Sequence, residues 1–157
     1  MSDPNPITLR LARRDDVPAL VALLADDAIS ASRDARDAGS NVAPDYVRAF
    51  EAIDSDPRNF LLVAEQDGAL VGTLQLTYIP SMSRRGRERA QVEAVRVRSD
   101  LRSRGLGRQM MEWAIEQAKE RGCRLIQLST DKRRGDAHRF YRTLGFESTH
   151  EGMKLEF

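Results

Sequence analysis

The chain has 157 residues and a mass of 17.7 kDa, a length that suits one domain with a hydrophobic core of its own. Charged residues make up 31% of the sequence, yet the formal net charge is only +1, so overall charge favours neither a nucleic-acid nor a membrane partner. No apolar run approaches the length of a membrane span, no leader pattern opens the chain, and a single cysteine excludes an internal disulfide framework. These features predict a cytoplasmic protein with one domain over residues 1–157.

The N-terminal part predicts a strand followed by two helices. Residues 7–11 alternate as a strand does. A helix with one apolar stripe should follow, capped by Asp15 or Asp16. Residues 30–42 are polar and predict a loop or a frayed turn. Pro44 suits the first turn of a second helix, which should end before position 57 because another proline stands there.

A hairpin and a basic loop come next. Two apolar runs, 59–65 and 69–79, flank Gln-Asp-Gly, a spacing typical of a β-hairpin. Residues 80–89 form a basic loop that allows two interpretations: a solvated loop, or a cluster at the mouth of a substrate site that attracts an anion. Nucleic-acid binding is less favoured because no aromatic residues are interleaved. The arginines concerned are Arg84, Arg85, Arg87 and Arg89.

The next strand changes its hydrophobic phase in the middle. Val92 and Ala94 are the apolar residues of the first half, whereas Val95 and Val97 are those of the second. One extra, unpaired residue produces such a change, so we expect a β-bulge near Ala94 and Val95. A bulge leaves backbone N–H and C=O groups free to bind a ligand.

A turn rich in arginine and glycine then leads into a helix. The glycines let the backbone approach a bulky anion, and the first N–H groups of the helix, at the positive end of its dipole, would bind a diphosphate. The turn is not the dinucleotide fingerprint, because Met110 stands where the third glycine would be, and no Gly-Lys-Ser/Thr follows as in a P-loop. The residues of this turn are Arg102, Ser103, Arg104, Gly105, Leu106, Gly107 and Arg108.

The last third predicts a helix, a strand, a helix and a strand. The first helix has core-facing Met110 and Trp113 and should end at 121–122. Residues 123–129 predict a buried parallel strand, in which Cys123 packs rather than reacts.

The second helix should be capped by Asp136 and stop at Gly145, and a final strand should cover residues 147–157. This order of elements predicts an α/β fold with a mixed sheet and helices on both faces.

Two blocks of sequence resemble the GNAT superfamily of N-acetyltransferases. Arg102-x-x-Gly105-x-Gly107, after a strand ending in Val-Arg-Val, resembles the acetyl-CoA-binding motif of that superfamily. Residues 136–146, with their Phe-Tyr pair and Leu-Gly-Phe, resemble its second conserved block. Residues 128–130 and 136–141 are similar to the aminoalkylphosphonate acetyltransferases in particular. The resemblance covers nearly the whole chain and implies a mostly antiparallel central sheet with a bulged, splayed central strand.

The resemblance also implies a co-substrate and partners. Acetyl-CoA is the expected co-substrate, with no metal, and a small-molecule amine is the expected partner; dimers are common in the superfamily. Asp131 stands where an asparagine often contacts the pantetheine, and a carboxylate there accepts but does not donate a hydrogen bond. The positions implied to contact acetyl-CoA are Val95, Arg96, Val97, the turn from Arg102 to Arg108, and Asp131.

Glu93 and Tyr141 are the candidate catalytic residues. Glu93 would act as the general base, and partial burial would raise its pKa toward a useful range. The alternative is an exposed glutamate paired with an arginine. Tyr141 would protonate the leaving thiolate, unless it is only a core aromatic residue. A bulge N–H near Val95 would stabilise the oxyanion. His138 is interpreted as structural.

The favoured function is therefore acetyl transfer from acetyl-CoA to the primary amine of a small molecule, by direct attack in a ternary complex. Two alternatives stay open: a protein or peptide N-acetyltransferase, and a CoA-binding regulatory module without catalysis.

Overall fold

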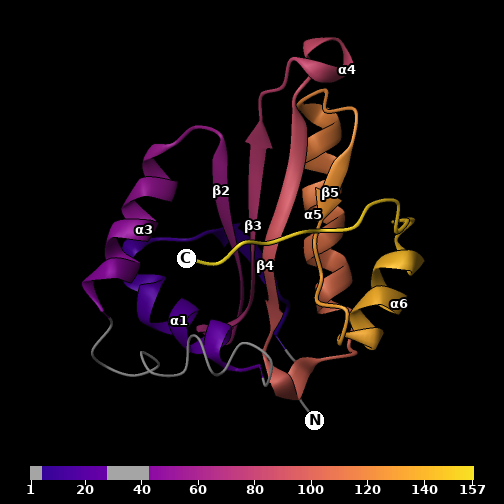
Figure 1. Cartoon of the computed structure of the whole chain (residues 1–157). Helices are drawn as coiled ribbons and strands as arrows, with labels where there is room; N and C mark the ends of the chain where they lie inside the picture. The colour runs from indigo at the N-terminus through magenta and orange to yellow at the C-terminus, as the bar shows by residue number, and fades with distance from the viewer. Residues whose placement is uncertain (1–4, 28–42) are drawn as a thin grey trace. The chain divides into compact units, whose positions relative to one another are not determined.

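The computed structural model describes residues 5–27 and 43–157 (Figure 1). It contains two compact units, Met1–Gln127 and Leu128–Phe157, which are treated separately below. The predicted loop at residues 30–42 lies outside the described residues. No helix among the described residues is long and apolar enough to cross a membrane.

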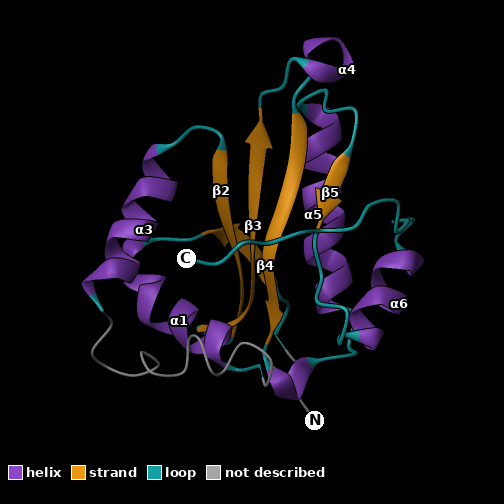
Figure 2. Cartoon of the chain, in the orientation of Figure 1, coloured by secondary structure: helices purple, strands orange, loops and turns teal. Residues whose placement is uncertain are grey.

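The first unit contains most of the helices and strands (Figure 2). Its elements are β1 (Thr8–Leu11), the 3-10 turn η1 (Arg14–Asp16), α1 (Val17–Ala25), α3 (Pro44–Ser55), β2 (Asn59–Gln66), β3 (Ala69–Ile79), α4 (Ser83–Gly86), β4 (Arg89–Val97), the 3-10 turn η3 (Ser99–Leu101) and α5 (Leu106–Glu120). Strand β5 (Ile126–Leu128) follows, and α6 (Gly135–Thr143) belongs to the second unit.

The strands form one sheet in the order β1-β2-β3-β4-β5. The pairs β1–β2, β2–β3 and β3–β4 are antiparallel, which confirms the expected mixed, mostly antiparallel fold. The predicted hairpin joins β2 to β3 through Asp67 and Gly68, both with positive φ (52° and 76°), the conformation that suits a two-residue hairpin turn.

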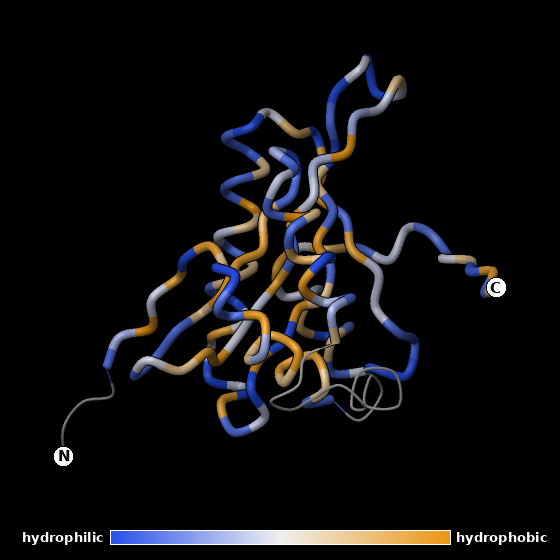
Figure 3. The backbone as a smooth tube through the Cα atoms, turned by 90° about the vertical axis from the view of Figure 1, so that its left-hand side faces the viewer, coloured by the Kyte–Doolittle hydropathy of each residue, from blue (hydrophilic) through white to orange (hydrophobic). Residues whose placement is uncertain are grey.

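Helices cover both faces of this sheet. Val63 lies on one face and belongs to a buried cluster with Val21 of α1 and Phe50 of α3. The other face packs against α5: a Cβ added at Gly72 would lie 3.0 Å from the sulfur of Met110, so glycine is what lets the helix approach β3 closely. Figure 3 shows the apolar stretches recurring along the strands and helices that build this core.

Asp16 is the N-cap residue of α1, as predicted, but its side chain makes no capping hydrogen bond to the helix. Its carboxylate instead accepts the Arg13 N–H at 2.7 Å and pairs with Arg10 at 2.7 Å. Arg10 also pairs with Glu65 on β2 at 2.7 Å. These bonds connect β1, β2 and the start of α1.

Replacing Asp16 by Asn is expected to lower the free energy of unfolding at neutral pH by about 1.5–3 kcal/mol, the range for a hydrogen bond to a charged group. The hydrogen bond from Arg10 holds the pKa of Asp16 below its usual value of 3.8. The stabilisation is therefore complete above the unfolded-state pKa and lost as the pH falls through the lower folded-state pKa. Urea denaturation of both proteins at several pH values checks this: the difference should shrink below about pH 4, and a constant difference would contradict the ionic explanation.

The predicted strand at 123–129 is shorter than expected, because its first residues complete the end of α5. Gly122 has φ 83°, and the N–H of Cys123 donates to the carbonyl of Ala118 at 2.9 Å. The backbone N–H of Cys123 is therefore used to end the helix, and the strand begins only at Ile126.

Two predictions for the second unit are wrong: the residue that caps its helix, and the final strand. Helix α6 begins at Gly135 with Arg134 as its N-cap, so Asp136 lies inside the first turn, where it forms an ion pair with Arg139. The predicted strand at 147–157 is absent: these residues are exposed and have no regular secondary structure. The alternating Met153, Leu155 and Phe157 supply a strand pattern, but a strand also needs a neighbour to pair with, and no described strand pairs with this segment.

Candidate active site

The predicted bulge lies at Ala94 and Val95 of β4. Glu93 pairs with Gln75 and Arg96 pairs with Thr73, so β4 advances three positions where β3 advances two. Two residues of β4 therefore face Leu74 alone. This confirms the bulge that the change of hydrophobic phase predicted.

Ala94 adopts an unusual backbone conformation at this bulge. Its φ is 52°, in the left-handed region that costs a residue with a Cβ about 1–2 kcal/mol. The regular pairs on either side hold it there. Strain of this kind is often found at functional sites, and here it interrupts the ladder between β3 and β4.

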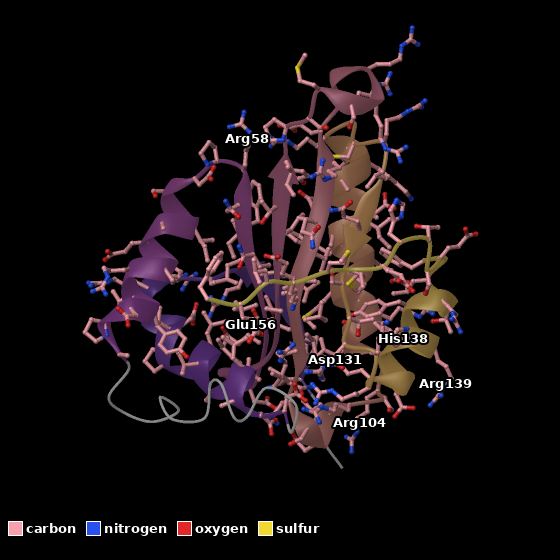
Figure 4. The ribbon with its side chains drawn as sticks, in the orientation of Figure 1. Arg58, Arg104, Asp131, His138, Arg139 and Glu156 are labelled. Atoms are coloured by element: carbon pink, nitrogen blue, oxygen red, sulfur yellow. The ribbon has the colours of Figure 1, made fainter. Side chains whose placement is uncertain are left out.

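The turn after β4 presents backbone N–H groups at the start of α5. Ser103 and Gly105 have positive φ (62° and 87°), and the first helical hydrogen bond runs from Gln109 N–H to the Gly105 carbonyl at 3.1 Å. The N–H groups of Leu106, Gly107 and Arg108 precede that bond, and no side chain caps the helix. Arg104 is exposed beside them (Figure 4). These features suit a diphosphate.

Arg102 connects this turn to the end of α1. It donates from Nε to the Val97 carbonyl at 3.1 Å and from Nη2 to the Asp26 carbonyl. The Asp26 carboxylate also accepts the Ser99 N–H at 2.9 Å. Arg102, expected to contact CoA, thus already holds the turn in place through backbone carbonyls.

Arg96 and its neighbours stabilise the strand after the bulge. Val95, Arg96 and Val97 are half-buried. Arg96 donates to the Val95 carbonyl at 2.9 Å and lies 3.9 Å from the carboxylate of Asp27, with both side chains largely buried. The guanidinium therefore braces the peptide beside the bulge rather than facing solvent.

Glu93 lies on the face of β4 that also carries its cross-strand partner Gln75. Its side chain is exposed, so the prediction that Glu93 is partly buried is wrong in the part of the chain that the structure describes. The reason is that its neighbours on this face are hydrophilic. No described arginine pairs with Glu93, so the alternative of an arginine-paired surface glutamate finds no support among the described residues.

A row of uncharged polar side chains lies on the face of the sheet that carries Glu93, and the sequence analysis did not predict it. The side-chain oxygen of Asn59 accepts hydrogen bonds from Gln75 at 3.2 Å and Thr77 at 2.7 Å. Gln127 donates to Gln91 at 2.6 Å. The sequence did contain a signal for this row: Thr73, Gln75 and Thr77 alternate along β3, and polar residues at every second position lie on one face of a strand.

Tyr141 lies in an aromatic cluster of the second unit. Its half-buried ring is 5.1 Å from that of Phe140 and 5.9 Å from that of Phe146, between centroids. These contacts fix the ring within α6 and the segment after it. A packing role and a proton-donor role are both compatible with them.

Asp131 also belongs to the second unit and is held by its neighbours. Its carboxylate accepts the backbone N–H and the Nε of Arg133, both at 2.9 Å, and these bonds keep the pKa of Asp131 well below its usual range. The ring nitrogen Nε2 of His138 lies 3.2 Å from the Asp131 carbonyl oxygen, which agrees with a structural role for this histidine. Figure 4 labels both residues.

Cys123 has the properties of a packing residue. It is half-buried, and burial raises the pKa of its thiol above the usual 9.0. A thiol with a raised pKa carries little thiolate at neutral pH and is a weak nucleophile. Among the residues described, no group of three or more histidine, cysteine or acidic side chains is placed to hold a metal ion.

Comparison with known proteins gives the class of this protein. The model of the acetyltransferase (GNAT) family matches residues 24–146, so the chain belongs to this family. The resemblance of the coenzyme motif and of the second block is thereby confirmed.

The chain is also similar to individual proteins. The chain is 30% identical over 95 residues to the aminoalkylphosphonate N-acetyltransferase of Salmonella typhimurium, and the match covers 60% of this chain and 61% of that protein, less than two thirds of its length. A crystal structure described as a transcriptional regulator from Bacillus halodurans C-125 is 45% identical, with a TM-score of 0.93, over 97% of this chain and 100% of that one. An aminoglycoside N-acetyltransferase in complex with CoA shares the fold alone, with a TM-score of 0.77 at 15% identity over 97% of this chain and 95% of that chain.

Replacing Gly107 by Ala is expected to weaken CoA binding about tenfold or more without lowering the melting temperature. Gly107 lies in the first turn of α5, where Ala is the better helix former, but its methyl group would keep a phosphate away from the N–H groups. Losing one charge-assisted hydrogen bond corresponds to this factor. Calorimetry with CoA measures it, with Glu116→Ala on an exposed position of α5 as the control. Unchanged affinity in Gly107→Ala would remove the turn from the coenzyme site.

Proposed function

We propose that the protein is an acetyl-CoA-dependent N-acetyltransferase that acetylates the primary amine of a small molecule by direct attack in a ternary complex. The observation that carries this proposal is the β-bulge in β4, on the strand that leads into the anion-binding turn. The interrupted ladder of β4 leaves backbone groups that can bind the thioester. The same strand leads into the turn that can bind the diphosphate.

The turn binds the coenzyme through backbone groups. The N–H groups at the start of α5 and the exposed Arg104 receive the diphosphate, while Arg102 and Asp26 keep the turn in shape. The backbone of Val95 and Val97 lies along the pantetheine arm, and Asp131 accepts a hydrogen bond from it. Membership of the GNAT family and the CoA complex of a protein with the same fold support this assignment.

The reaction forms a C–N bond and breaks a C–S bond. The neutral amine attacks the thioester carbon, and the N–H at Val95 stabilises the oxyanion that forms. Glu93 takes the proton from the ammonium form of the amine, through water, before the attack. When the C–S bond breaks, the electron pair leaves on sulfur, and Tyr141 donates the proton that converts the thiolate to a thiol. The attacking nitrogen, cationic after the attack, loses its extra proton to water and becomes the neutral amide nitrogen, and Tyr141 regains a proton from water.

Direct transfer is favoured over a covalent acyl-enzyme. The sequence contains one cysteine, Cys123, whose thiol is half-buried with a raised pKa. Such a thiol is poorly suited to attack a thioester. The amine therefore meets acetyl-CoA itself.

A second function deserves a test because of one relative. The Bacillus halodurans protein, 45% identical to this chain, is described as a transcriptional regulator. A chain that binds CoA as a signal without turnover would fit that description. Such a module would bind CoA but release no thiol.

Release of CoA thiol from acetyl-CoA in the presence of a panel of amines, aminophosphonates and basic peptides tests both functions. The proposed enzyme should release thiol with at least one small amine, in amounts that rise with the amine concentration. CoA binding without amine-dependent release would support the regulatory module. Release with peptides alone would favour a protein N-acetyltransferase.

A further inference from the structure

Two consecutive acidic residues at the end of α1 contact two different parts of the proposed coenzyme site. Asp26 and Asp27 follow the last helical residue, Ala25, so neither side chain is part of the helix. The Asp26 carboxylate accepts the backbone N–H of Ser99, at the start of the segment that leads into the diphosphate turn, at 2.9 Å. The Asp27 carboxylate instead pairs with Arg96, directly after the bulge.

Asp27 reaches the bulge through Arg96. One guanidinium nitrogen of Arg96, Nη2, lies 3.9 Å from a carboxylate oxygen of Asp27, and the other, Nη1, donates to the carbonyl of Val95 at 2.9 Å. The guanidinium is planar and rigid, so an anion that holds one nitrogen also fixes the direction of the other. The carboxylate of Asp27 is therefore connected to a backbone carbonyl of the bulge through one rigid group.

The burial of this ion pair favours a positioning role. Only 15% of the Arg96 side chain and 11% of the Asp27 side chain are exposed. Taking two charges out of water costs free energy that their attraction hardly recovers, so a buried pair contributes little net stability compared with apolar side chains of the same size. What the pair does supply is a fixed direction for the guanidinium, which apolar side chains do not.

The carbonyl that Arg96 holds belongs to the residue whose N–H is proposed to bind the oxyanion. The ladder holds the strand at Glu93 and at Arg96, but the two bulge residues between them lie opposite Leu74 alone. The N–H and the carbonyl of Val95 are separated by only two rotatable bonds, so holding the carbonyl limits the directions open to the N–H. Arg96 thus fixes the backbone at the point where the ladder does not.

We propose that Asp27 is a positioning residue for acetyl transfer: through Arg96 it orients the bulge peptide that receives the thioester carbonyl. Asp26 acts instead on the coenzyme turn, because its carboxylate binds Ser99 and its backbone carbonyl binds Arg102. The two neighbouring carboxylates therefore serve different steps, Asp27 the chemical step and Asp26 the binding of CoA. This inference rests on the proposed function and adds a residue to it.

The experiment compares the same truncation at the two adjacent positions. Asp27→Ala and Asp26→Ala each remove one carboxylate that lies outside the helix, and Asp54→Ala removes one from an exposed position of α3 as the neutral control. Single-turnover thiol release, with acetyl-CoA bound to excess enzyme and the most active amine of the panel at saturation, measures the chemical step. Calorimetry with CoA measures binding, and the melting temperature shows whether each variant is folded.

We expect Asp27→Ala to lower the single-turnover rate at least tenfold, because a small misplacement of a group at the reacting centre slows the reaction strongly. Its Kd for CoA should stay within about threefold of the wild type. Asp26→Ala should show the reverse, with a Kd for CoA about fivefold higher or more and a single-turnover rate within about threefold of the wild type. Asp27→Glu restores the carboxylate and should recover part of the rate.

A double variant tests whether Asp27 acts through Arg96. Arg96→Met keeps an unbranched stem without the guanidinium, so it should itself lower the single-turnover rate. Adding Asp27→Ala to Arg96→Met should then cause no further loss, because the connection from the carboxylate to the Val95 carbonyl is already broken. A residue that only stabilises the fold would add a loss of its own.

Four results would overturn the inference. Thiol release with none of the amines would remove the proposed function and the inference with it. In an active wild type, three results would overturn the inference alone: a loss of less than tenfold in Asp27→Ala, the same pattern of losses in Asp27→Ala and Asp26→Ala, or additive losses in the double variant. If Asp27→Ala does not fold, Asp27→Asn, which keeps the shape and removes the charge, takes its place with the same expectation.

Discussion

Deleting Ala94 is expected to lower kcat/KM for acetyl transfer at least a hundredfold while the sheet stays folded. Without this residue, Val95 faces Leu74 and the pairs Glu93–Gln75 and Arg96–Thr73 both persist. The strand becomes regular, and its N–H groups are used by the ladder instead of the oxyanion. Removing one oxyanion donor costs about 10²–10³ in rate.

Stability should move in the opposite direction. The deletion removes a residue with φ 52° and completes the ladder, so the melting temperature should stay equal or rise. The matched control is Ala94→Gly, which keeps the bulge and relieves the strained φ, and its activity should remain within a few-fold of the wild type. A deletion variant that transfers acetyl groups normally would show that the bulge has no part in the chemistry.

Replacing Glu93 by Gln is expected to lower the rate at neutral pH by about 10²–10⁴-fold, the usual contribution of a general base. Gln keeps the shape and hydrogen bonding of Glu but cannot take a proton. The loss should shrink at high pH, where the amine is already neutral, and CoA affinity should hardly change. The measurement is kcat/KM against pH.

Tyr141→Phe serves as the comparison, because its defect is in protonating the leaving thiolate. Raising the pH should not restore its rate, and its loss should be smaller, since a thiolate leaves without help more readily than an alkoxide. Parallel pH profiles for the two variants would contradict the separate roles. A fully active Glu93→Gln would exclude Glu93 as the base.

The bulge and the anion-binding turn could be predicted because their signals are local. Val92, Val95 and Val97 record the change of phase directly in the sequence, and Gly105 marks a left-handed position before α5. The hairpin was equally clear, because Asp67 and Gly68 suit a two-residue turn. Each of these features depends on a few neighbouring residues and on backbone sterics alone.

Features that depend on register could not be predicted. The polar row of Asn59, Gln75 and Gln91 comes from three strands, and only their pairing shows that these side chains share a face. The same holds for Arg89, which a linear interpretation groups with Arg84. The predicted strand at 147–157 failed for the same reason. Alternating apolar residues make a segment able to pair, but they do not show whether a partner strand lies beside it.

The bracing of the turn was also beyond the sequence. Arg102 matched the coenzyme motif, which suggested a phosphate contact, but its hydrogen bonds run to the carbonyls of Val97 and Asp26. Asp26 is far from Arg102 along the chain, and the sequence around Asp26 contains no pattern that predicts this contact. Long-range contacts of this kind appear only once the helix and the turn are placed together.

The most direct test of the central claim is the stoichiometry of the reaction with one active amine. Thiol release is counted while the acetylated amine is identified and quantified by mass spectrometry, for the wild type and the Ala94 deletion. N-acetyl transfer predicts one acetylated amine for each thiol released by the wild type, and a rate at least a hundredfold lower for the deletion. Thiol release without acetylated amine, or equal rates for the two proteins, would contradict acetyl transfer at the bulge of β4.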